Sequence, residues 1–128
     1  MTTVADMVWF VTSDPSFQAF AGSRLYPITL PQQPTFPAAT YFQVAFPHEH
    51  THDGVETVHP LFQFDCYGGT YQDAHALVAI LDNIFGRWKS SFGDAAFGEN
   101  RRDIPEPDLP PIGARFRVML EVTVWGLT

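Results

Sequence analysis

The feature that most constrains the fold is a long apolar stripe in the segment TYQDAHALVAILDNIFGRW, residues 70–88. Its apolar residues recur at spacings of three and four, which is the period of one face of an α-helix. Thr70 followed by Asp73 resembles a capping box and marks where the helix begins. A helix with such a stripe over about four turns must pack on another apolar surface. The stripe consists of Ala74, Leu77, Val78, Leu81, Ile84, Phe85 and Trp88.

Alternating segments supply that surface. Residues 40–46, 61–67 and 115–125 alternate with a period of two, as strands with one apolar face do, and residues 95–104 are a weaker candidate strand. Two short helices are expected at about 3–12 and 15–21. The sequence therefore predicts an α+β fold, an antiparallel or mixed sheet of about four strands with helices packed on one face. The expected core is Phe42, Val44, Phe62, Phe64, Leu77, Leu81, Phe116, Val118 and Leu120.

The chain is expected to form one domain over residues 1–128. Hydrophobic residues make up 45% of the sequence, enough to offset the entropy of ordering a chain of this length. Four prolines between residues 27 and 37 indicate an extended connection or an edge segment. We also expect a long hairpin loop at about 47–58 and a second long loop region at about 86–113.

The stretch HEHTH fits the zinc-peptidase pattern H-E-x-x-H. In that pattern His48 and His52 hold a zinc ion and Glu49 acts as general base, which requires a helix so that both histidines share one face. The longer zinc signature fails here, because Val55 and Val58 stand where a glycine and a third histidine are needed. The motif alone therefore gives weak support for a metal-dependent hydrolase.

The surroundings of this motif favour a hairpin instead. The segments on both sides alternate as strands do, and Asp53-Gly54 is a favoured reversal between paired strands. We predict a solvated hairpin tip with no catalytic residue, metal or cofactor. An alternative that stays open is a metal ion captured by His48, His50 and His52 on one side of the loop.

Other candidate residues favour structure or assembly over catalysis. Cys66 alternates onto the apolar face of its strand and is predicted to be a core residue. Arg101 and Arg102 are either solvated or in contact with an acidic neighbouring subunit. Met119 and Trp125 lie on the more polar face of the last strand. With Tyr41 and Tyr67, they suggest that another subunit covers this face.

Charge limits the classes of partner. The net charge is −7, which disfavours tight binding to nucleic acid, since that affinity comes mainly from cations that displace counterions. The N-terminal segment lacks a basic start, and its apolar run is interrupted by Asp6 and Thr12. We therefore expect a cytoplasmic, soluble protein without a signal peptide or membrane partner.

The order and spacing of the segments resemble a known family. The run SRLYPITLPQQPTFPAATYFQV, the strand LFQFDCYGG with the helix TYQDAHALVAILDNIF after it, and the closing strand RFRVMLEVTVWG are similar to the tail-completion, or tail-terminator, proteins of long-tailed bacteriophages. The similarity extends from about Val4 to Trp125. Its most specific parts are the spaced prolines and the residues Gln63, Asp65, Tyr67, Ala74 and Ala76.

The resemblance implies a structural role in the virion. Such proteins form a homo-hexameric ring that stops growth of the tail tube and joins the tail to the head connector, or stopper, so the chain would lie in the tail or neck after assembly in the host cytoplasm. DNA would pass through the ring without binding tightly. The His-rich segment matches no motif of that family, and from the residues themselves we expect contacts with a neighbouring subunit or another partner at His48, Glu49, His50, His52, Asp53, Arg101, Arg102, Met119 and Trp125. The alternatives are the metal-dependent hydrolase and a small intracellular binding module.

Overall fold

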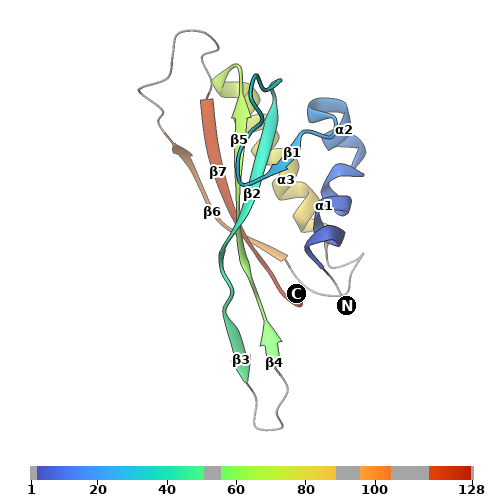
Figure 1. Cartoon of the computed structure of the whole chain (residues 1–128), viewed down its shortest axis with the longest axis vertical. Coiled ribbons are helices and arrows are strands. Elements are labelled where there is room, and N and C mark those ends of the chain that lie inside the picture. The colour runs from blue at the N-terminus through green and yellow to red at the C-terminus, as the bar shows by residue number, and fades with distance from the viewer. Residues whose placement is uncertain (1–2, 51–55, 89–95, 105–115, 128) are drawn as a thin grey trace.

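The structure is a computed structural model of the chain and describes residues 3–50, 56–88, 96–104 and 116–127 (Figure 1). Helices and a mixed sheet form an α+β fold, which confirms the predicted class. The elements in chain order are α1 (Val4–Thr12), α2 (Pro15–Ala21), β1 (Leu25–Pro27), β2 (Ala38–Ala45), β3 (His48–His50), β4 (Glu56–Val58), β5 (Leu61–Gly68), α3 (Tyr71–Gly86), β6 (Ala96–Ile104) and β7 (Phe116–Val124).

The main sheet has five strands in the order β1-β2-β5-β7-β6, one more than predicted. The extra strand is β1, a short edge strand that pairs in parallel with β2, whereas the other neighbours are antiparallel. Pro27 ends β1, because proline cannot donate to a strand ladder. The region predicted as a long loop at 86–113 contains the nine-residue strand β6, while residues 89–95 and 105–115 lie outside the described part.

The sheet buries one face beneath α3, with α1 and α2 packed at the side of α3 (Figure 1). Every residue of the predicted stripe on α3 is buried. None of the helices among the described residues has the length and apolar character needed to cross a membrane. The predicted core residues that are confirmed are Phe62, Phe64, Leu77, Leu81, Val118 and Leu120.

Three predicted core residues are wrong: Phe42, Val44 and Phe116. Tyr41 is the residue of β2 that lies opposite Phe64, so Phe42 points to the face of the sheet away from α3, which we call the back face. Val44 has no partner at the irregularity in the pairing of β2 with β5 and is 48% exposed. Phe116 begins β7, is 42% exposed and packs edge to face against Tyr71.

Cys66 is fully buried in the core, as predicted. Burial raises the pKa of the Cys66 thiol, because the apolar surroundings disfavour the thiolate. The thiolate is the nucleophilic form of cysteine, so a buried thiol with a raised pKa is inert. Cys66 therefore fills space between the sheet and α3.

Candidate functional site

The most prominent feature outside the core is a hairpin that projects beyond the main sheet (Figure 1). Its strands β3 and β4 form a separate two-stranded sheet in which His48 pairs with Val58 and His50 with Glu56. We call residues 48–58 the arm, of which the structure describes β3 and β4. Isolated two-stranded hairpins are marginally stable in water, so an arm of this kind gains stability from a surface that it can contact.

The arm does not have the backbone that the zinc-peptidase pattern needs. Residues His48–His50 form strand β3, so the hairpin prediction is confirmed for this part and the helical arrangement of H-E-x-x-H is absent from it. His52 and Asp53 lie outside the described residues. Within the described residues, no group of three or more histidine, cysteine, aspartate or glutamate side chains could hold a metal ion.

The base of the arm is fastened to the end of the sheet. The His59 N–H donates to the Pro47 carbonyl at 3.1 Å, and the Gly126 N–H donates to the Val58 carbonyl at 2.9 Å. The Trp125 ring stacks on the His59 ring, with centroids 4.3 Å apart. These contacts fix the direction in which the arm leaves the body.

The chain itself covers part of the back face, the face for which contact with another subunit is predicted. Met119 is completely buried within one copy, and Tyr67 is nearly so. Tyr41 lies on the opposite face, where it packs against Phe64. Of the four residues behind that prediction, Trp125 alone is partly exposed on the predicted face, and its ring already contacts His59.

A partly buried ion pair lies on the back face between β5 and β7. Arg117 on β7 approaches Asp65 on β5, with Nη2 3.3 Å from Oδ2. The Asp65 side chain is only 5% exposed, and its Oδ1 accepts a hydrogen bond of 2.8 Å from the Gln63 amide. The guanidinium also lies over the Tyr67 ring, 5.8 Å from the centroid. A buried charge that lost its partner would be costly, so the two residues hold each other in place.

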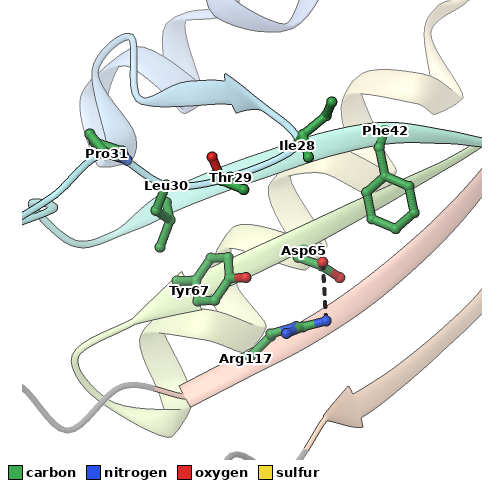
Figure 2. Close-up of a pocket in the computed structure, with 8 residues that line it drawn as sticks. All are labelled: Ile28, Thr29, Leu30, Pro31, Phe42, Asp65, Tyr67 and Arg117. Carbon is green, nitrogen blue, oxygen red and sulfur yellow. Dashed lines mark ion pairs between the residues drawn. The ribbon is translucent and has the colours of Figure 1, made fainter. Parts of the chain in front are cut away.

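The segment after β1 runs along one side of a pocket of about 440 Å³ that this ion pair also lines (Figure 2). We call residues 28–31 the strap. The strap forms one wall, and the floor carries the ion pair together with Tyr67, whose hydroxyl end points toward it. The volume lies in the range of small-molecule pockets. Its lining residues are Ile28, Thr29, Leu30, Pro31, Phe42, Asp65, Tyr67 and Arg117.

The strap begins with a strained turn at Ile28. The φ angle of Ile28 is +67°, which is rare for a β-branched residue, and the Thr29 N–H donates to the Pro27 carbonyl at 2.7 Å. This is the hydrogen bond of a γ-turn. The Ile28 N–H is tied to the Tyr41 carbonyl at 2.9 Å, yet its side chain is 71% exposed. Such strain persists only where the surroundings fix the backbone, often beside ligand sites.

We expect Ile28→Gly to be more stable than Ile28→Ala by about 1–2 kcal/mol. Alanine keeps the Cβ that makes a positive φ unfavourable, whereas glycine adopts it freely, and both variants remove the same exposed side chain. Urea unfolding of the two variants measures the difference. If the alanine variant were equally stable, Ile28 would not hold the positive φ.

Three polar contacts tie the edge strand β6 to α3. Arg101 Nη2 lies 3.0 Å from Asp82 Oδ2, so Arg101 has an acidic partner within its own chain, whereas the prediction placed such a partner in a neighbouring subunit. Asp103 accepts a 2.7 Å hydrogen bond from the Tyr71 hydroxyl and lies 2.8 Å from His75 Nε2. The bond to Asp103 raises the pKa of Tyr71, because an ionised phenol would face the carboxylate. These exposed contacts hold β6 against α3.

The predicted site residues thus fall into separate places. His48, Glu49 and His50 belong to the arm, Trp125 stands at its base, and Arg102 is exposed on β6. Sequence reasoning missed the pocket, although Asp65, flanked by Phe64 and Cys66 in an apolar strand, was a signal of a buried charge that needs a partner.

No family model matches the chain, and no curated protein matches it. Function is therefore inferred from the arm, the back face and the order of elements in the sequence.

Proposed function

We propose that the chain is a structural virion protein, a tail terminator of a long-tailed bacteriophage. In this role it assembles as a homo-hexameric ring that caps the tail tube and joins the tail to the head connector, or stopper. The role requires no catalysis, metal or cofactor. The support from the sequence is the resemblance in the order and spacing of its segments, from the proline-rich run to the closing strand.

The observation that carries the proposal is the arm. A hairpin fastened at its base and extended beyond the body has the reach to contact a neighbouring subunit or the tail tube. The chain enters the arm from β2 and leaves it into β5, and both strands belong to the packed sheet, so the arm is connected directly to the core. An assembly protein needs this combination of a rigid body and a protruding contact element.

The hydrolase alternative loses its main support, because His48–His50 form a strand. Tightly bound, stoichiometric zinc together with peptidase activity would restore it. The small binding module keeps one favourable observation, the pocket on the back face. Assembly and a pocket can coexist in one chain, and the proposal for the pocket below does not depend on the ring.

The mass of the native assembly tests the proposal. Native mass spectrometry and negative-stain images of the purified protein, alone and mixed with a candidate tail-tube protein from the same genome, should show a six-subunit ring and its attachment to the tube end. A chain that stays monomeric under both conditions would contradict the proposal. Genes for tail-tube and portal proteins next to its own would support it independently.

We expect no tight binding to DNA. Each copy carries a net charge of −7, so a ring would repel a polyanion overall and let it pass through. Fluorescence anisotropy with a labelled duplex at physiological salt should give no binding below about 1 µM. A submicromolar dissociation constant would mean that a basic surface of the ring holds the DNA.

A further inference from the structure

The pocket on the back face has apolar walls and a polar floor. Leu30 points from the strap toward Tyr67, and the Phe42 ring stands at the other end (Figure 2). Flat rings on two sides suit a planar group, because aromatic faces stack or pack edge to face. The floor is formed by Asp65, Arg117 and the hydroxyl end of Tyr67.

The floor carries no net charge. Asp65 and Arg117 are the charged residues among those lining the pocket, and they form an ion pair with each other. A charged ligand would have to leave water without a net opposite charge to meet it, which is costly in a partly enclosed site. The pocket therefore favours an uncharged ligand.

The floor also has acceptor capacity. A carboxylate can accept about four hydrogen bonds, and Asp65 accepts one from Gln63 at Oδ1 while Arg117 meets Oδ2. Each oxygen therefore keeps room for a further donor. A ligand with an N–H or O–H group can use this capacity, whereas one with only acceptor groups cannot.

We propose that this pocket binds an uncharged planar group that carries an N–H or O–H donor. The donor meets Asp65, and the plane lies between Phe42, Tyr67 and Leu30. Phenol, indole and primary amide groups have this chemistry, whether they belong to a small molecule or to a side chain of a partner polypeptide. The site lies beside the part of β2 beyond Tyr41, where the described residues provide no further pairing strand on that edge.

Four probes of one shape test the proposal. Methyl signals of Ile28 and Leu30 are followed by NMR during titration with benzamide, acetophenone, benzoate and benzamidinium. Benzamide should bind at millimolar concentrations, and the other three at least about tenfold more weakly, because one lacks the donor and two carry charge. Equal binding of any of the three would overturn the proposal. So would the absence of shifts at about 20 mM benzamide, a range that a ligand of about nine heavy atoms should reach.

Variants locate the binding. Phe42→Ala and Leu30→Ala should each weaken benzamide binding about fivefold or more, since each removes one wall. Val44→Ala is the matched control, an exposed apolar residue of the same strand outside the pocket lining, and should change nothing. Asp65→Asn should weaken benzamide binding, because it replaces the carboxylate acceptor by a neutral amide. If Asp65→Asn does not fold, the Phe42→Ala and Leu30→Ala variants and the four probes still test the proposal.

A last comparison identifies the source of the ligand. The blocked peptide acetyl-Gly-Tyr-Gly-amide is titrated beside 4-methylphenol, which has the same ring. Tighter binding of the peptide by about tenfold or more supports a partner polypeptide, whose backbone can also pair with β2. Equal binding supports a small molecule. If neither compound shifted the Ile28 and Leu30 signals, the donor chemistry proposed for the pocket would be wrong.

Discussion

Replacing Leu81 with alanine is expected to lower the free energy of unfolding by about 2–5 kcal/mol. Leu81 is completely buried on α3, in the cluster where that helix meets β5 and β7. The substitution removes apolar contacts and leaves a cavity that the packed sheet beneath cannot fully close. Urea denaturation followed by circular dichroism measures the loss, and the folded spectrum should stay unchanged.

The control for this substitution lies on the same helix. Asn83 is exposed, so Asn83→Ala should change stability by less than about 0.5 kcal/mol. A loss below about 0.5 kcal/mol for Leu81→Ala as well would mean that α3 does not pack through this face. The pair of variants thereby separates the packing of the stripe from any general effect of changing the helix.

The position of α3 and of the two central strands could be predicted because each pattern is long and unambiguous. The stripe on α3 repeats with a helical period, and β5 and β7 alternate through their full length. Because one face of each strand is buried, a shift of the strand pairing by one residue would expose the whole apolar set of that strand. Their predicted core residues are therefore confirmed, apart from Phe116 at the exposed start of β7.

The sequence pattern does not show which side of β2 packs against α3. Both alternating sets of TYFQVAF contain aromatic residues, Tyr41 in one and Phe42 in the other, so composition alone does not decide which set faces α3. The pairing of Tyr41 with Phe64 decides it, and that contact is long range. The irregularity at Val44 then changes the alternation toward the end of the strand.

The pocket depends even more on long-range register. Asp65 and Arg117 are far apart in the sequence, and they meet because Tyr67 of β5 pairs with Arg117 of β7. The strap reaches the same place only because β1 pairs in parallel with β2 and ends at Pro27. No local pattern encodes either pairing. The arm, by contrast, follows from a reversal dipeptide between two alternating strands and was predicted.

Shortening the arm is expected to abolish ring assembly while leaving the monomer folded. The Pro47 carbonyl already accepts a hydrogen bond from the His59 N–H, which is the bond that closes a two-residue turn. Replacing residues 48–58 by Asn-Gly therefore joins the two ends in their existing register, with a sequence that favours such turns. The core and the contact between His59 and Trp125 are untouched.

The expected result is a change of assembly without a change of stability. Native mass spectrometry should show the ring for the natural chain and monomers for the shortened one, and urea unfolding should differ by less than about 1 kcal/mol. Replacing His48, Glu49 and His52 together by alanine is the matched control. It keeps the length of the arm, so it should leave the fold intact and abolish no hydrolytic activity, because the proposed role depends on reach and not on a zinc site.

Hydrogen exchange is a second test of whether the arm makes contacts when the ring assembles. Hairpins stabilised mainly by a partner exchange faster when that partner is absent, so amides of the arm should be less protected in the monomer than in the ring. Equal protection in both states would mean that the arm makes no contact on assembly. Normal rings or normal tail joining by the shortened chain would lead to the same conclusion, and the contact surface would then have to be sought on the body, where Arg102 and Trp125 are the remaining predicted candidates.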